Sequence, residues 1–151
     1  MEDQLKVIIP PDEIIPEMYE TYRNEEDLSA ESYYECDEEK QKRLFINMKR
    51  FFRAAYIGND YAGWLTIIHR EESLRINVGF YLNPEFRRKG LMVKFLNIHC
   101  DELKKIDTDK QITAGTKFTN ISAYKTLERS QFKRDPENDD GEWARFVFDK
   151  K

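Results

Sequence analysis

Three consecutive cations precede a glycine between residues 83 and 92, and this segment has the composition of an anion-binding loop. It joins an expected strand to an expected helix. The first N–H groups of a helix have no partner within it and lie at the positive end of its dipole, so they favour a phosphate. Gly90 allows the main chain to approach an anion closely, and Arg87, Arg88 and Lys89 raise the local positive potential. Each charge-assisted hydrogen bond contributes about 1.5–3 kcal/mol, so a few would hold a pyrophosphate. On this segment alone, an ordinary solvated turn stays open.

Strands and helices must hold this loop, and the pattern of apolar residues predicts where they lie. Period-two runs bounded by turn residues predict strands at Leu5–Ile9, Arg53–Gly58, Ala62–Arg70, Ser73–Leu82, Gln111–Thr116, Phe132–Arg134 and Trp143–Phe148. Helical spacing predicts a helix from near Pro16, a loop or short helix over Asn24–Glu39, and helices over Glu38–Phe52, Met92–Lys105 and Asn120–Arg129. This order predicts one α+β domain over residues 1–151, in which about four helices flank a mixed, largely antiparallel sheet.

The composition agrees with a single folded domain. The chain has 151 residues, of which 40% are hydrophobic and 13% aromatic, enough for a buried core. The first residues lack the basic start and apolar stretch of a signal peptide, and no apolar run reaches the roughly 18 residues of a membrane span. We therefore expect a cytoplasmic protein without membrane contact. Cys36 and Cys100 lie far apart and are expected to be reduced thiols.

Charge is unevenly distributed along the chain. The portion up to Gln41 has 3 basic and 14 acidic residues, whereas the portion from Lys42 has 22 basic and 15 acidic residues. The acidic portion predicts a solvated face on the first helices, and a surface for a basic partner is the alternative.

The basic loop resembles the acyl-coenzyme-A signature of the GNAT superfamily of N-acetyltransferases, which reads Arg/Gln-x-x-Gly-x-Gly/Ala. Arg87, Gly90 and Met92 take those places, after Pro84–Phe86 in the family's Pro-Glu-aromatic form. Two residues depart from the family pattern. Met92 replaces a smaller residue, and Arg88 stands where glycine is frequent.

A second segment, residues 120–132, resembles the family's pattern Asn-x-x-Ala/Ser, Leu/Tyr-Glu-Lys, Gly-Phe. The matching positions are Asn120, Ala123, Leu127, Glu128 and Phe132. Gln131 replaces the glycine of the pattern. Leu127 stands where many relatives have a tyrosine that protonates the leaving thiolate, and a leucine has no proton to donate.

The resemblance covers nearly the whole chain and implies a GNAT-like fold, acetyl-CoA as co-substrate and direct transfer of the acetyl group to an amine. The cofactor-binding residues that it implies are Tyr81, Leu82, Arg87, Arg88, Lys89, Gly90, Leu91, Met92 and Asn120. The loop would bind the pyrophosphate together with two main-chain N–H groups of the following helix. Asn120 would lie beside the pantetheine, and a main-chain N–H between Gly79 and Leu82 would stabilise the oxyanion.

Three residues are candidates for catalysis. Glu72, with Glu71 in the same turn, is a candidate base, and Asn77 is a candidate water-holder on the strand expected over Ser73–Leu82. Tyr124 lies one turn before Leu127 and is a candidate proton donor. Each of them also fits an ordinary turn, strand or core position. No set of His and Cys residues has the spacing of a metal site.

The acceptor and the partners follow from the resemblance only in outline. We expect a small-molecule or protein amine as acceptor and neither membrane nor nucleic acid as partner, and a homodimer stays open. The acidic first portion commonly shapes the acceptor side of this fold, which implies a cationic acceptor such as a polyamine, an aminoglycoside or a Lys-rich peptide. A catalytically silent coenzyme-A-binding regulator and a protein-interaction module with an acidic surface are the alternatives.

Overall fold

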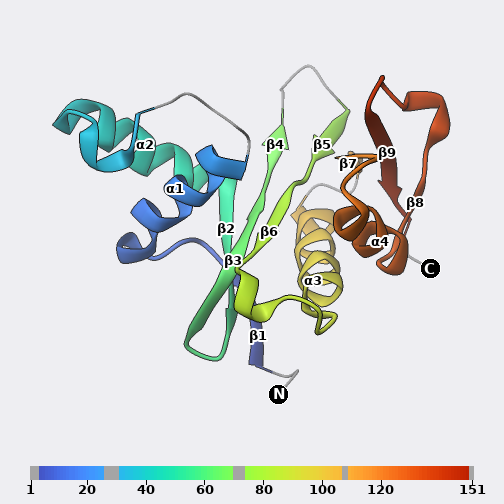
Figure 1. Ribbon diagram of the computed structural model, residues 1–151, viewed down its shortest axis with the longest axis horizontal. Helices are drawn as coiled ribbons and strands as arrows, with labels where there is room; N and C mark the ends of the chain where they lie inside the picture. Colours follow the sequence, from blue (N-terminus) through green and yellow to red (C-terminus); the bar gives the residue numbers. More distant parts are fainter. Residues whose placement is uncertain (1–3, 26–30, 70–73, 107–108, 150–151) are drawn as a thin grey trace.

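The β-strands of the described residues form two sheets, which meet where the pairing of two neighbouring strands is interrupted (Figure 1). The computed structural model describes residues 4–25, 31–69, 74–106 and 109–149. The first sheet has the order β1-β2-β3-β6, with bounds Leu5–Ile8, Phe52–Ile57, Asp60–Thr66 and Phe80–Leu82. The second has the order β4-β5-β7-β9-β8, with bounds Ile68–His69, Arg75–Asn77, Gln111–Lys117, Trp143–Phe148 and Phe132–Arg134. In the described residues β5 and β7 are parallel and the other strand pairs are antiparallel, which confirms the predicted mixed, largely antiparallel class.

Helices lie on both sides of this β-structure (Figure 1). The described residues form four α-helices, α1 at Ile15–Glu25, α2 at Glu38–Phe51, α3 at Leu91–Ile106 and α4 at Ile121–Arg129. Each lies where the apolar spacing predicts a helix. Helices α1 and α2 lie beside the first sheet, whereas α3 and α4 lie on the opposite side and against the second sheet.

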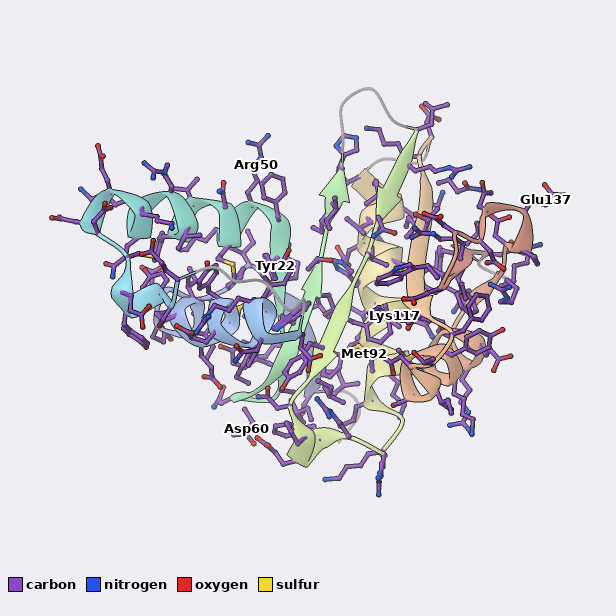
Figure 2. The ribbon with its side chains drawn as sticks, turned by 45° about the horizontal axis from the view of Figure 1, so that its top comes forward. Tyr22, Arg50, Asp60, Met92, Lys117 and Glu137 are labelled. Atoms are coloured by element: carbon purple, nitrogen blue, oxygen red, sulfur yellow. The ribbon has the colours of Figure 1, made fainter. Side chains whose placement is uncertain are left out.

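The two groups of helices enclose separate cores. Trp64 of β3 packs with Ile15 and Met18 on the α1 side, and Leu65, the next residue, packs with Phe95 on the α3 side. Figure 2 shows Tyr22 on the α1 side of the sheet, as its packing against the first of these cores requires. Because side chains alternate between the two faces of a strand, β3 contributes residues to both cores.

Local signals explain where the second helix begins and ends. The Asp37 side chain accepts a hydrogen bond from the main-chain N–H of Lys40 at 2.8 Å, which caps α2. Glu38 lies in the first turn and Arg50 in the last, so both charges complement the helix dipole. Helix α1 begins at Ile15, beside the proline that is tolerated only in a first turn.

The strands expected over Ala62–Arg70 and Ser73–Leu82 pair antiparallel, as predicted, but the pairing is not continuous. Gly63 lies opposite Leu82 in the first sheet, and Ile68 lies opposite Asn77 in the second, in the same register. The strands break at residues 67 and 78–79. The expected turn at Glu71 and Glu72 lies outside the described residues.

Thr66 and Gly79 create the break. The Gly79 N–H donates to the Thr66 hydroxyl at 2.7 Å, where a regular hairpin would use the Thr66 carbonyl. A Cβ on Gly79 would lie 2.9 Å from that hydroxyl, so the contact needs glycine. The Val78 N–H then turns to the Thr113 carbonyl of β7 at 2.8 Å. Beyond this bond β6 pairs with β3 and β7 pairs with β9, so β6 and β7 part.

Candidate active site

The basic loop predicted to bind an anion lies exposed at the start of α3. A short 3-10 turn at Pro84–Phe86 leads into it. Arg88 and Gly90 both have left-handed main chains, with φ of 67° and 72°. An L-residue in that region costs roughly 1–2 kcal/mol, which explains why glycine is frequent at the position of Arg88 in the motif that it resembles. These two residues, separated by Lys89, turn the chain sharply into the N-terminus of α3.

Side chains of the loop are arranged for two different tasks. Arg87 folds back on β6, because its Nε donates to the Leu82 carbonyl at 2.7 Å and its guanidinium lies 5.2 Å from the Tyr81 ring centroid. Arg88 and Lys89 are exposed and have no ion-pair partner in the described part of the chain. Arg87 therefore fixes the loop to the strand, and the next two cations face solvent.

Leu91 and Met92 can offer an anion only their main chain. Leu91 is half-buried against the core on the α3 side, and Met92 is buried within it. Figure 2 labels Met92 at the start of α3. Both residues lie in the first turn of α3, where N–H groups have no partner inside the helix. The size of Met92 is accommodated by the core, so it does not obstruct the loop.

The main chain of β6 exposes one edge where it parts from β7. The Thr66 N–H bonds to the Gly79 carbonyl, and the Asn83 N–H bonds to the Ala62 carbonyl. Main-chain groups alternate in direction along an antiparallel strand, so those of Tyr81 face β3. The N–H groups of Phe80 and Leu82 therefore face the gap left by β7.

From the sequence, the oxyanion donor is expected among the main-chain N–H groups from Gly79 to Leu82, and this alternation excludes two of them. The Gly79 N–H is occupied by Thr66, and the main chain of Tyr81 is occupied by pairing with β3. The side chain of Tyr81 stacks on Trp64, with 5.6 Å between ring centroids. Two candidate donors remain, the N–H groups of Phe80 and Leu82. The Phe80 N–H is the first on the open edge after the break.

Asn120 and Tyr124 lie at the start of α4. The Asn120 Oδ1 accepts from the Ala123 N–H at 3.2 Å and caps the helix. The Tyr124 ring packs edge-on against Phe146 at 5.2 Å, and the Arg134 guanidinium lies 5.8 Å from its centroid. Tyr124 is thus part of an aromatic cluster, and its predicted role as a proton donor rests on the sequence alone.

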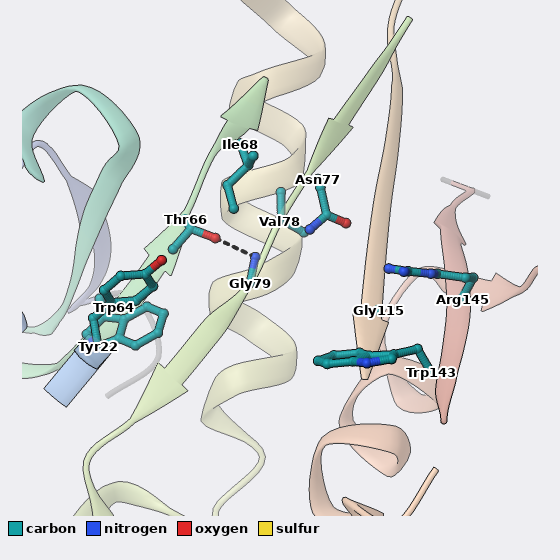
Figure 3. Close-up of a pocket in the computed structure, with 10 residues that line it drawn as sticks. All are labelled: Tyr22, Trp64, Thr66, Ile68, Asn77, Val78, Gly79, Gly115, Trp143 and Arg145. Atoms are coloured by element: carbon teal, nitrogen blue, oxygen red, sulfur yellow. Dashed lines mark hydrogen bonds between the residues drawn. The ribbon is translucent and has the colours of Figure 1, made fainter. Parts of the chain in front are cut away.

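A pocket of about 220 Å³ opens at the break, on the α1 side of the second sheet (Figure 3). Ten residues line it: Tyr22, Trp64, Thr66, Ile68, Asn77, Val78, Gly79, Gly115, Trp143 and Arg145. Asn77 is the predicted catalytic residue that reaches this pocket. Tyr124 does not line it, and Glu72 lies outside the described residues.

Trp143 and Arg145 are pocket residues that the sequence analysis did not identify. Both alternate along β9 with Ala144 and Phe146, which are fully buried on the α4 side. The alternation of apolar residues along this strand thus indicated that the large side chains of Trp143 and Arg145, each with polar N–H groups, lie on the opposite face of the sheet. What it did not indicate was that this face borders the break, because the break depends on contacts between distant residues.

Beneath the break, a buried histidine completes a short network of hydrogen bonds. His99 of α3 lies in the core, and its Nε2 is 3.2 Å from the Thr66 carbonyl, the same threonine whose hydroxyl accepts from Gly79. Burial lowers the pKa of His99 to about 4, and the nearby Arg53 acts in the same direction. His99 is therefore neutral near neutral pH and donates to the strand that carries the break.

Acidification is expected to destabilise the protein through His99. In the unfolded chain this histidine takes up its proton near pH 6.5, whereas in the folded chain it does so only near pH 4. The unfolded state thus binds more protons between these values, and stability falls by about 3 kcal/mol as pH drops from 6.5 to 4. Urea unfolding at a series of pH values measures this loss. His99→Gln is the reference, because carboxylates contribute equally to the pH dependence of both proteins. If the free energy of unfolding falls equally steeply with pH in both, His99 is not the cause of the loss.

The remaining reactive groups lie outside the pocket. Cys36 and Cys100 are buried and unpaired, and burial raises the pKa of the Cys100 thiol. Among the residues that the structure describes, no three His, Cys, Asp or Glu residues cluster as metal ligands would. In the same ranges, no helix combines the length and apolarity needed to cross a bilayer.

Comparison with known proteins gives a family and a fold. The model of the acetyltransferase (GNAT) family matches residues 14–132. A search of curated proteins finds no match.

Three solved structures are similar over most of their length. The ribosomal-protein-S5-alanine acetyltransferase of Vibrio fischeri is 18% identical, with a TM-score of 0.68, covering 95% of this chain and 91% of that one. The dodecameric spermidine N-acetyltransferase of Vibrio cholerae is 14% identical, with a TM-score of 0.70 and coverage of 96% and 93%. The yncA protein of Salmonella typhimurium, solved with its cofactor acetyl-CoA, is 15% identical, with a TM-score of 0.66 and coverage of 96% and 91%. At these identities the likeness shows the fold.

Proposed function

The chain belongs to the acetyltransferase (GNAT) family, and we propose that it transfers an acetyl group from acetyl-CoA directly to a primary amine. The observation that carries the proposal is the junction at β6. One strand provides an open main-chain edge and, directly after it, an exposed basic loop at a helix N-terminus. A cofactor with a pyrophosphate and an extended, amide-containing arm matches both features.

The chain's own groups divide the work of binding. Arg88, Lys89 and the first N–H groups of α3 would hold the pyrophosphate, with Gly90 allowing close approach. The open edge of β6 would bond to the amides of the pantetheine arm. The Asn120 Oδ1 caps α4, which leaves the Nδ2 of the same amide to donate a hydrogen bond to the pantetheine arm.

In the reaction, the amine nitrogen attacks the thioester carbonyl carbon. A C–N bond forms as the C–S bond breaks, the amine loses one proton and the coenzyme A sulfur gains one. The Phe80 N–H would stabilise the oxygen as it becomes negative, and loss of such a donor typically costs about 2.7–4 kcal/mol. A thiol with a pKa of about 8.5 leaves without much help, which compensates for a leucine at position 127.

The described lining of the pocket contains no aspartate, glutamate or histidine that could take the amine proton. An α-amine, with a pKa of about 7.7–8.0, is substantially neutral near neutral pH, whereas a lysine side chain at about 10.4 is not. We therefore favour an α-amine as acceptor, with Asn77 holding a water that carries the proton away. Glu72, which lies outside the described residues, stays a predicted base.

Two measurements on the purified protein test the proposal. Isothermal titration should show saturable binding of acetyl-CoA and of coenzyme A. With a mixture of amines, acetyl-CoA should release free thiol in proportion to the acetylated amine detected by mass spectrometry. Absence of acetyl-CoA binding would refute the proposed function.

A catalytically silent coenzyme-A-binding regulator is the second candidate, and Leu127 favours it. This leucine is fully buried in the core at the position where many relatives of this family have the tyrosine acid. Tight binding of acetyl-CoA without thiol release, for every amine class tried, would support the regulator over the enzyme.

A further inference from the structure

The pocket at the break has a single formal charge among its described lining residues, and that charge is positive. We infer that the pocket binds an amine that also bears a carboxylate, and that Arg145 recognises this carboxylate. The inference rests on the proposed acetyl transfer and names the class of its acceptor. It replaces the cationic acceptor that the acidic first portion of the sequence suggested.

Arg145 reaches the pocket because β7 has a glycine opposite it. Gly115 and Arg145 are paired across β7 and β9. A Cβ on Gly115 would lie 2.5 Å from the Arg145 Nη1, so the side chain lies flat against the glycine main chain. Figure 3 shows it extending from β9 across β7 toward Asn77, above the indole of Trp143. The guanidinium is 5.9 Å from the Trp143 ring centroid.

The guanidinium of Arg145 has no acceptor in the described part of the chain. It makes no hydrogen bond or ion pair there, although the residue is half-buried and the group carries five N–H donors. The nearby Asp139 is committed elsewhere, because its two oxygens accept from Arg134 at 2.8 and 2.7 Å and one also accepts from the Arg145 main-chain N–H. A planar fork of donors without a partner, facing a pocket, is the arrangement that binds a carboxylate.

The rest of the pocket fits the other parts of such an acceptor. Asn77 accepts from the Thr113 hydroxyl at 3.3 Å through Oδ1, so its Nδ2 is left as a second donor. Tyr22 and Trp64, 5.7 Å apart between ring centroids, form an apolar wall on the opposite side. Of the acidic first portion, Tyr22 is the residue that lines the pocket, and none of the described carboxylates does. A polyamine would thus meet a cation and no counter-charge.

The test compares matched amines that differ only in the charge of one group. Dipeptide amides Ala-Asp and Ala-Glu are set against Ala-Asn and Ala-Gln, with putrescine and spermidine as cationic members. For the wild type, we expect a kcat/KM for the carboxylate member of each pair about 10- to 100-fold above that of its amide. Arg145→Gln should remove this preference while leaving the amides unchanged.

Three further variants separate charge from structure. Arg145→Lys keeps the charge and should restore part of the preference, and Gly115→Ala, which displaces the guanidinium, should weaken it. Arg43→Gln removes an exposed cation of α2 that has no partner among the described residues, and it should leave the preference intact. Titration of acetyl-CoA into each variant shows that the cofactor site is unaffected.

Each outcome decides the inference separately from the proposed function. Equal or better turnover of amides or polyamines, with acetyl-CoA bound, would overturn the inference and leave the acetyltransferase proposal standing. If no amine is turned over, calorimetric binding of Ala-Asp amide that Arg145→Gln abolishes supports the inference, and its absence overturns it. An Arg145-dependent preference for succinyl-CoA over acetyl-CoA would place the carboxylate on the acyl group and overturn it too.

Discussion

Replacing Gly90 by aspartate is expected to weaken acetyl-CoA binding by about 100-fold or more. Gly90 has a φ of 72°, and a Cβ there would meet no atom within 4 Å, so the variant has room to fold. The cost comes from left-handed strain of roughly 1–2 kcal/mol and from a carboxylate placed where a pyrophosphate should lie. A loss of two powers of ten in affinity corresponds to about 2.7 kcal/mol. Isothermal titration with acetyl-CoA measures the loss.

Gly141 provides a matched control for this change. Its φ is 55°, it also has open space around the missing Cβ, and it lies just before β9 in the turn that follows β8. Gly141→Asp introduces the same strain and the same charge away from the loop. Its affinity for acetyl-CoA should equal that of the wild type. If Gly90→Asp binds within threefold of the wild type, residues 87–92 do not hold the pyrophosphate.

Local patterns in the sequence were sufficient to predict most of the fold. The helices over Glu38–Phe51 and Leu91–Ile106 both follow from the spacing of their apolar residues. These signals lie within one element, so neighbours in the chain determine them. The antiparallel pairing of β3 with β6 was predictable for the same reason, because both strands are close in the sequence. Their register was not, since the expected two-residue turn at Glu71 and Glu72 would place residue 63 opposite 80, whereas it lies opposite 82.

The interruption of that hairpin was not predictable, since it depends on long-range contacts. It needs Thr113 of β7 to take the Val78 N–H, and His99 of α3 to donate to the Thr66 carbonyl. Neither partner is signalled by the residues near position 66. The acceptor side was missed for the same reason. Arg145 is 68 positions beyond Asn77, and only the order of strands in the second sheet brings them to one pocket.

Among the described glycines, Gly63 is the one at which substitution by alanine is expected to destabilise the protein most. A Cβ at this position would lie 2.0 Å from the Tyr81 carbonyl oxygen and 2.9 Å from the Leu82 Cα. Both are main-chain atoms of β6, so relief requires the strand itself to move away from β3. We expect a loss of about 3 kcal/mol or more in the free energy of unfolding. For a chain of this size that lowers the melting temperature by roughly 6–12 °C, which differential scanning calorimetry measures.

Two other alanine variants show that this loss comes from the main chain of β6. Gly141→Ala meets no neighbour and should cost only its left-handed strain, and Gly115→Ala meets the flexible end of Arg145, which can swing away. Both should melt within a few degrees of the wild type. Since β6 carries the open edge of Phe80 and Leu82 and leads into the basic loop, Gly63→Ala protein that still folds should also bind acetyl-CoA more weakly. If Gly63→Ala has the melting temperature and the acetyl-CoA affinity of the wild type, β6 tolerates displacement. This result would contradict the proposal that the open edge of β6 positions the thioester.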